Sequence, residues 1–332
     1  MKTGVLQFFS WPGRHGPLEE VYARALERIE IMDKTGFDAV WLAEHHFSTF
    51  SVCPSVHMIG VMAATRTKRL RIGTAVSLAA LYHPLRLAEE VALLDHLSGG
   101  RVNWGAGRGF SHLEFRAFGV PPEESADRFR EAVEIVLKSW TEERFSFHGK
   151  HFTVEDIELL PKPLQQPHPP VWMAATSPPA IEWAASQGHS ILMDPHASMK
   201  EIGEKRRLYA SKLAEAGFSD KGRDIPMARL VALAATESEA EAVARRGAQW
   251  IVDSYAGPQQ PHRKAAPVQR TYDGKDPAQY YVDSVILHGT PESIVDKIAR
   301  LEEEIGLNYL MCAPLSRESF RLLADKVVPR LG

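Results

Sequence analysis

Short apolar segments alternate with amphipathic segments along all 332 residues of this chain, and no other feature restricts its fold as much. Apolar runs of strand length occupy residues 1–9, 39–43, 70–76, 101–105, 171–174, 191–193, 227–235 and 308–313. Segments with apolar residues at helical spacing lie between them, at residues 17–35, 55–65, 84–97, 125–140, 178–187, 199–216, 238–250 and 291–305. Continuous apolar runs are typical of buried parallel strands, whose two faces are covered by helices. Eight such strands predict an α/β fold of the (β/α)8 TIM-barrel type.

A doubly wound sheet is the alternative architecture. It would place a glycine-rich dinucleotide-binding turn after the first strand, and this chain has none there. Gly105, Gly107 and Gly109 follow the fourth strand, but their spacing is G-x-G-x-G and lacks the third glycine of the G-x-G-x-x-G fingerprint. A barrel of ~250 residues with insertions also fits the chain length. We therefore expect one barrel domain over residues 1–332.

Two long connections interrupt the alternation, and they predict insertions before the fifth and the eighth strands. Residues 142–170 are rich in proline and aromatic residues, whereas residues 255–284 are polar and contain several prolines. Long connections in compact domains are usually functional or disordered. The second insertion is therefore either a lid or a solvated excursion, and the sequence leaves both interpretations open.

The composition is that of a soluble globular protein, with 44% hydrophobic and 24% charged residues. A net charge of -3 gives no reason to expect nucleic acid or an anionic membrane as a partner. The N-terminal apolar run is too short for a signal peptide, and no run approaches the ~20 residues of a membrane span. Cys53 and Cys312 indicate a reducing compartment without a disulfide framework, and a single disulfide between the two is the alternative. We expect a cytoplasmic enzyme.

The end of the second strand carries Glu44, His45 and His46 in immediate succession. Barrels of this type keep their chemistry at the carboxyl ends of the strands, so the three residues form a candidate catalytic site. An imidazole titrates near neutrality and can move a proton at working pH. Because neighbouring side chains alternate in direction along a strand, we expect Glu44 to orient a hydrogen-bond network while His46 packs under a loop.

A metal site is a second interpretation of the same three residues, since some barrel hydrolases bind zinc through histidines on an early strand. Such a site needs further ligands from later strands, and Asp194 and His196 follow the sixth strand. Packing in the core or at the surface is the third interpretation for each histidine taken alone.

Motifs in a fixed order along the chain resemble those of a known family. They are GFDAVWLAEHHF (residues 36–47), GTA (73–75), HP (83–84), LD (94–95), GGR (99–101), RG (108–109), FG (118–119), EWAA (182–185), DSY (253–255) and GTP (289–291). The ordered set covers essentially the whole chain and resembles the bacterial luciferase-like, flavin-dependent monooxygenases. The resemblance implies a (β/α)8 barrel with the flavin across its C-terminal mouth, in agreement with the alternation of strands and helices.

The resemblance also implies an activity. Reduced FMN, supplied by a separate NAD(P)H:flavin reductase, would react with O2 at its C4a position. The resulting peroxyflavin would oxidise a small organic substrate such as an aldehyde or another carbonyl compound. Members of the family are commonly dimers, which favours a homodimer. Two alternatives stay open: an F420-dependent oxidoreductase of the same superfamily, which transfers hydride without oxygen, and a non-catalytic flavin-binding subunit.

The side chains of the implied site follow from the same resemblance. His45 corresponds to the family's catalytic histidine, with Glu44 in support, and no metal is expected. Arg108 matches a phosphate-contacting arginine, and Arg128 is a second candidate, because a guanidinium can bind phosphate through two parallel hydrogen bonds. Gly107 stands where the luciferase α-subunit has a reactive cysteine beside the flavin, which argues mildly against light emission.

Two backbone segments complete the implied cofactor site. Ala75 and Val76 end the third strand, and in relatives this peptide lies against the flavin ring and can be cis. Ala174, Thr176 and Ser177 lie between the fifth strand and a helix, in a turn that contacts the flavin phosphate in the family. Helix N-termini present free amides to anions, and Ser177 is equally suited to capping this helix.

Overall fold

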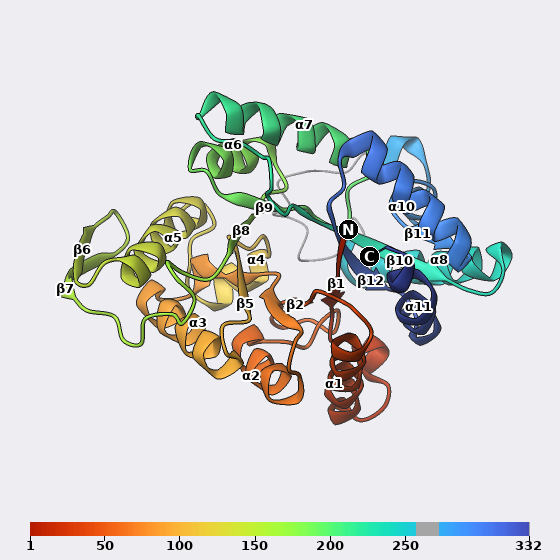
Figure 1. Ribbon diagram of the computed structural model, residues 1–332, viewed down its shortest axis with the longest axis horizontal. Helices are drawn as coiled ribbons and strands as arrows, with labels where there is room; N and C mark the ends of the chain where they lie inside the picture. The colour runs from red at the N-terminus through yellow and green to blue at the C-terminus, as the bar shows by residue number, and fades with distance from the viewer. Residues whose placement is uncertain (257–271, 332) are drawn as a thin grey trace. The chain divides into compact units, whose positions relative to one another are not determined.

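The structure is a computed structural model, and it describes residues 1–256 and 272–331. The chain divides into two compact units, which are described separately (Figure 1). Unit 1 contains Met1–Gln7, Ile31–Val40 and Met173–Gly332, and unit 2 contains Phe8–Glu30 and Trp41–Trp172. Three elements pass from one unit into the other, namely α1 (Leu18–Lys34), β2 (Ala39–Leu42) and β8 (Val171–Ala174).

Unit 1 is built on parallel strands. The strands β1 (Lys2–Gln7), β12 (Tyr309–Pro314), β10 (Pro226–Leu233) and β11 (Leu287–Gly289) pair in the order β11-β10-β12-β1. The strand β9 (Ser190–Leu192) continues into Met193, which bridges to Met227 of β10. Every residue of β10 is buried. Burial on both faces explains why this strand is apolar throughout except at Arg229, in place of an alternating pattern.

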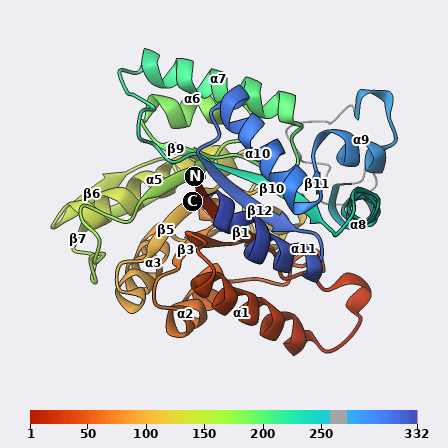
Figure 2. The same cartoon turned by 45° about the vertical axis from the view of Figure 1, so that its right-hand side comes forward.

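The helices of unit 1 each follow an N-cap residue, and in all but the first of those named next the side chain of that residue accepts a first-turn N–H. They are α6 (Pro178–Ser186), α7 (Met199–Glu215), α8 (Glu237–Ile251), α9 (Pro277–Ser284), α10 (Pro291–Ile305) and α11 (Arg317–Leu322). Ser198 and Glu201 form a capping box at the start of α7, in which side chain and backbone satisfy each other's donors. Figure 2 shows α9 beside α8, with α10 and α11 beside the strands β11 and β10.

Unit 2 also contains parallel pairs. The strand β3 (Arg71–Thr74) pairs with β5 (Val102–Gly107), and the short β4 (Ser77–Leu78) pairs with the end of β5. The helices are α2 (Val56–Arg66), α3 (Pro84–Ser98), α4 (His112–Ala117) and α5 (Ser125–Thr141). The helix α3 packs against both α2 and α5 (Figure 1). Gly73 is needed where β3 passes the Trp41 indole, because a Cβ there would lie 2.3 Å from Trp41 Cε3.

Two motif residues of unit 2 hold connections together. Asp95 is fully buried, and its carboxylate accepts hydrogen bonds from Gln165 N at 2.8 Å and Gln165 Nε2 at 2.7 Å. Arg101 donates from Nη1 to the carbonyl oxygen of Leu70 at 2.8 Å and from Nη2 to that of Ala64 at 3.0 Å. These bonds fasten α3, α2 and the start of β3 to one another and to the connection after β7. The LD and GGR motifs therefore have a structural role.

Each of the eight predicted strands overlaps a strand of the structure, and the α/β class with mostly parallel pairing is confirmed. Closure into an eight-stranded barrel, a single domain over residues 1–332 and the exact insertion positions stay predictions. The sequence did not predict β4 or β11. It also left residues 142–170 without regular structure, whereas they contain an antiparallel hairpin of β6 (Phe145–His148) and β7 (Thr153–Ile157). Phe145, Phe147 and Val154 of this hairpin cluster with Ile135 of α5, which fixes it to that helix.

The predicted second insertion, residues 255–284, is only partly described. Residues 257–271 lie outside the described residues, so the lid interpretation stays a prediction. The described end of the insertion contains a 3-10 turn at Tyr272–Gly274 and the helix α9. Both cysteines are buried and free. Among the described helices, none is long and apolar enough to cross a membrane.

Candidate active site

Glu44 is the centre of a buried hydrogen-bond network in unit 2. It follows strand β2 and Ala43 in the chain. Its side chain accepts hydrogen bonds from Tyr82 Oη at 3.1 Å and from Leu78 N at 3.4 Å, and His46 Nε2 lies 3.1 Å from Oε1. Glu44 is only 3% exposed, so these donors replace water around its oxygens. Burial, and then the nearby Glu44, raise the pKa of Tyr82, so its hydroxyl stays protonated and donates.

His46 belongs to the same network. Its backbone N donates to Glu114 Oε1 at 3.0 Å, and its ring lies edge-on to Phe118 with 4.8 Å between ring centroids. Glu114 is buried in α4, and this burial raises its pKa. From the sequence we expect different neighbours for Glu44 and His46, whereas in the structure their side chains meet. Residues two apart on an extended chain share a face, and this is why the two side chains meet.

His45, between these two residues, has different surroundings. Its backbone N donates to the carbonyl oxygen of Cys53 at 3.0 Å, which fixes the residue on the following loop. Its half-buried ring stacks on Phe8 at 6.2 Å between centroids and meets the edge of Phe50 at 5.5 Å. Burial raises the pKa of Cys53 to about 12, so the neighbouring thiol stays protonated. The imidazole of His45 therefore lies between two aromatic rings.

Four of the predicted cofactor residues gather where β3 and β5 end. The Ala75–Val76 peptide, whose isomer the sequence left open, is cis, and both residues are half-buried. The chain then enters β4, which pairs with β5 through Leu78 and Gly107. Arg108 follows Gly107 directly. The structure thus brings Ala75, Val76, Gly107 and Arg108 to one end of neighbouring strands.

The two candidate arginines differ in their partners. Arg108 is half-buried, and its Nε donates to the adjacent carbonyl oxygen of Gly109 at 3.3 Å. Burial lowers the pKa of Arg108, and among the described residues no carboxylate lies within ion-pair distance of it. Arg128, in contrast, is paired with Glu124 at 2.9 Å and lies over the ring of Phe152. A partly desolvated guanidinium with no such carboxylate beside it suits a phosphate, so Arg108 fits this role better than Arg128.

The remaining predicted residues, Ala174, Thr176 and Ser177, belong to unit 1. Ser177 occupies the N-cap position of α6, but its hydroxyl makes no capping hydrogen bond. The first two helical positions are Pro178 and Pro179, which have no N–H, and Ala180 N is already bonded to the carbonyl oxygen of Ser177. The start of α6 therefore offers hydroxyl groups in place of the free first-turn amides that the sequence analysis expected.

The structure gives the metal interpretation no support. Among the described residues, no three His, Cys, Asp or Glu side chains are grouped so that they could hold a metal ion. Asp194 instead pairs with Lys205 at 2.9 Å and accepts a hydrogen bond from His196 N. The ring of His196 is bonded to the hydroxyl of Tyr281 at 3.1 Å. These side chains of unit 1 form a structural network.

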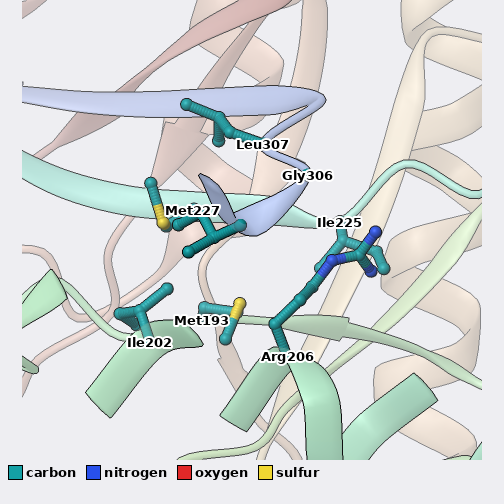
Figure 3. A pocket seen from close by; sticks show the side chains of 8 residues that line it. Met193, Ile202, Arg206, Ile225, Met227, Gly306 and Leu307 are labelled. Atoms are coloured by element: carbon teal, nitrogen blue, oxygen red, sulfur yellow. The ribbon is translucent and has the colours of Figure 1, made fainter. Parts of the chain in front are cut away.

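Unit 1 also contains a small pocket, and none of the predicted site residues lines it. It is lined by Met193, Ile202, Arg206, Ile225, Met227, Ile305, Gly306 and Leu307. Figure 3 shows Arg206 extending from α7 beside Ile225, with the two methionines below Leu307. The pocket is a packing gap between α7, the loop after α10 and the strands.

Sequence reasoning missed the partners of the candidate residues. Tyr82 and Glu114 bond to the 44–46 segment although they are far from it in the chain. His57, Ser77 and Glu90 form a second buried network in unit 2. Tyr82 precedes the HP motif and Glu114 follows an N-cap serine, but no spacing in the sequence connects them to Glu44 or His46. Only the folded chain brings these groups together.

Comparison with known proteins agrees with the α/β fold and identifies the family. Residues 1–308 match the family described as luciferase-like monooxygenase, and the chain belongs to that family. An uncharacterized protein, y4wF of Sinorhizobium fredii, is 33% identical over 88% of this chain and 84% of its own length. Limonene 1,2-monooxygenase of Rhodococcus erythropolis is 30% identical over 92% of this chain and 81% of its own. The oxygenase component of a flavin-dependent trigonelline monooxygenase of Acinetobacter baylyi is 30% identical over 68% and 63%.

Solved structures share the fold over the whole chain. Monooxygenase RslO1 of Streptomyces bottropensis superimposes with a TM-score of 0.86 at 27% identity, covering 100% of both chains. The oxygenating constituent of 3,6-diketocamphane monooxygenase of Pseudomonas putida, in complex with FMN, gives 0.82 at 20% identity, covering 99% and 98%. An F420-dependent secondary alcohol dehydrogenase gives 0.78 at 19% identity, covering 98% and 97%. The last two likenesses concern the fold alone.

Proposed function

We propose that this protein is a monooxygenase that uses reduced FMN and O2 to oxidise a small organic molecule, with aldehydes and other carbonyl compounds as the first candidates. Membership of the luciferase-like family and the similarity to limonene and trigonelline monooxygenases support this proposal. The trigonelline enzyme is named as an oxygenase component, which supports a separate NAD(P)H:flavin reductase as partner here. The flavin, once reduced and bound, supplies the activation of O2.

The observation that carries the proposal is the state of Arg108. A half-buried guanidinium that has no carboxylate partner among the described residues costs free energy unless an anion binds it. It directly follows the strand end at Gly107, beside the β4 segment, and the FMN phosphate would supply the missing charge. We expect Arg108 to donate two hydrogen bonds to that phosphate. Thr176 and Ser177 stay predicted hydroxyl contacts to phosphate, each to be tested by substitution.

His45 is the residue that we expect to move a proton in this reaction. Its position depends on the hydrogen bond to the Cys53 carbonyl oxygen, and Phe8 and Phe50 pack against its half-buried ring. An imidazole fixed in this way can transfer a proton to or from a bound reactant. Glu44 acts indirectly, because its bonds to Tyr82 and Leu78 hold the chain at the residue directly before His45.

Anaerobic titration with reduced FMN, followed by admission of O2, tests the proposal. We expect saturable binding of reduced FMN, and then O2 consumption matched by product from a panel of aldehydes, ketones, limonene and trigonelline. Reduced F420 is titrated in parallel, because one similar structure is an F420-dependent dehydrogenase. Binding and oxidation of F420 without O2 consumption would replace FMN by F420 in the proposal. O2 consumption that yields only hydrogen peroxide across the panel would favour a non-catalytic subunit.

A further inference from the structure

A buried array of three polar side chains lies beside the candidate active site in unit 2. His57 of α2 is 4% exposed, and its Nδ1 lies 3.0 Å from Glu90 Oε2 while its Nε2 lies 3.0 Å from Ser77 Oγ. Ser77 is fully buried in β4, and among the described residues its hydroxyl has no other hydrogen-bond partner. Glu90 of α3 is 27% exposed and also accepts a hydrogen bond from Arg86 at 2.8 Å.

The chemistry of these groups fixes the direction of the hydrogen bonds. The bond from His57 lowers the pKa of Glu90 against the opposing effect of burial, and Arg86 lowers it further. An ionised carboxylate only accepts, so Nδ1 of His57 carries the proton that is donated to Glu90. When the imidazole is neutral, its Nε2 accepts and Ser77 Oγ donates to it. The array runs from Ser77 through His57 to Glu90.

This connectivity is that of a serine hydrolase triad, but burial excludes a nucleophilic role for Ser77. A nucleophile has to reach its substrate, and the Ser77 side chain is wholly covered by protein. The hydrogen bonds of the array therefore serve to hold β4 in position.

The strand β4 connects this array to the candidate active site. Ser77 directly follows the half-buried Ala75–Val76 segment, and the next residue, Leu78, donates from its backbone N to Glu44 Oε2. The ring of Tyr82, which bonds to Glu44, lies edge-on to His57 with 5.8 Å between centroids. The segment at residues 75–78 is thus held at Ser77 by the array with His57 and Glu90, and at Leu78 by the Glu44 network.

We propose that His57 is a positioning residue of the flavin site, which with Glu90 fixes Ser77 and so the Ala75–Val76 segment that borders the cofactor. This inference rests on the proposed function, because it assigns residues 75–76 to the wall of the flavin site. Positions next to reacting groups tolerate little movement, so release of this segment reduces turnover more than it reduces cofactor affinity.

The test compares substitutions that break the array with matched substitutions elsewhere in unit 2. Ser77→Ala and Glu90→Gln remove the two ends, and Ser139→Ala and Glu89→Gln are their controls. Ser139 is a fully buried serine, and among the described residues its hydroxyl bonds only within its own helix, to Val136. Glu89 is the neighbouring carboxylate of α3 and has no bond to His57. Each variant is assayed for product formation, hydrogen peroxide release, FMN affinity and thermal midpoint.

We expect Ser77→Ala and Glu90→Gln to lower kcat by roughly 10- to 100-fold and to raise hydrogen peroxide release, with FMN affinity and substrate KM nearly unchanged. The controls should keep wild-type kcat. Equal kcat in Ser77→Ala and Ser139→Ala would overturn the inference. Ring 15N NMR of His57, identified by its loss in His57→Gln, gives a readout that needs no flavin: a proton on Nε2 in place of Nδ1 would also overturn it. A wild-type protein that binds no reduced FMN would instead refute the proposed function, and the inference with it.

Discussion

The hydroxyl of Tyr82 donates a hydrogen bond to Glu44 Oε1 across 3.1 Å, and it joins residues that lie 38 positions apart in the chain. Glu44 is 3% exposed, so the loss of a donor cannot be made good by water. This bond closes the network on the side of the 3-10 turn that follows β4, at Ala79–Leu81. Its removal should therefore have a measurable cost in stability.

We predict that Tyr82→Phe lowers the free energy of unfolding by about 1.5–3 kcal/mol, the range for a hydrogen bond to a charged group. Tyr22→Phe is the matched control, because Tyr22 Oη donates to the neutral carbonyl oxygen of Val52 at 2.8 Å. The control should lose only about 1 kcal/mol. Urea unfolding at pH 7 measures both values, and equal losses would show that Glu44 is not the charged acceptor inferred here.

The sequence predicted much of the fold because its signals are local. The continuous apolar run of β10 and the helical spacing of α10 each depend on burial of one short segment. The strand β4 was missed because two residues carry no periodicity, and it is a strand only because Ala106 and Gly107 lie beside it. The hairpin β6–β7 was missed for a related reason, since the α5 residue Ile135 provides its apolar support.

For the candidate site, the sequence predicted which residues to inspect and not how they are connected. The EHH motif directed attention to Glu44, but the hydrogen bonds of Glu44 come from Tyr82 and Leu78, whose positions depend on the path of β4. The twin prolines after Ser177 were visible in the sequence, and their consequence for the amides of α6 could have been derived there. The array of His57, Ser77 and Glu90 has no sequence signature at all, because three separate elements contribute to it.

We predict that His45→Ala lowers turnover by roughly 10²–10⁴-fold, the usual contribution of a positioned proton-transfer group. Affinity for reduced FMN should change little, since the ring of His45 contacts Phe8 and Phe50 and the substitution leaves Arg108 intact. His148→Ala, in the exposed hairpin, is the control and should keep normal turnover. Stopped-flow product formation and fluorescence titration of FMN separate the two quantities. Undiminished substrate oxidation in His45→Ala would end the assignment.

We predict that Arg108→Ala weakens binding of FMN by roughly 10- to 100-fold, equivalent to the loss of a hydrogen bond to a charged group. Riboflavin, which has no phosphate, should bind wild type and variant alike. Arg128→Ala should have a small effect, because its guanidinium is already paired with Glu124. Equilibrium titrations with both flavins provide the comparison. An equal loss for FMN and riboflavin would place Arg108 away from the phosphate.

We predict a homodimer that uses the outer face of α2 and α3. Met58 is 73% exposed and Met62 41% on α2, and on the adjoining α3 Leu93 is 50% and Leu97 55% exposed. Large apolar side chains grouped in this way are typical of protein–protein contacts. Met58→Glu combined with Leu97→Glu should convert the dimer to a monomer, as measured by light scattering after size exclusion. Leu160→Glu, at a 64% exposed leucine outside these helices, should leave the mass unchanged; a monomeric wild type would contradict the prediction.

The stability of the protein should depend on pH through Glu90. The hydrogen bond from His57, and further Arg86, lower the pKa of Glu90 in the folded chain below that of an unfolded glutamate, about 4.3. Between the two pKa values the unfolded chain binds more protons, so the free energy of unfolding rises with pH in that window. The contribution of Glu90 is therefore fully present above the unfolded pKa and is lost as the pH falls through the folded one.

We predict that Glu90→Gln destabilises the protein most at pH 7 and that its difference from wild type shrinks as the pH falls below about 4. The control substitution Glu89→Gln should give a difference that stays nearly constant, because Glu89 has no bond to His57. Urea unfolding at pH 7, 5, 4 and 3 provides the comparison. A difference between Glu90→Gln and wild type that is independent of pH would mean that the carboxylate is not held ionised by His57, and the direction of the whole Ser77–His57–Glu90 array would have to be reversed.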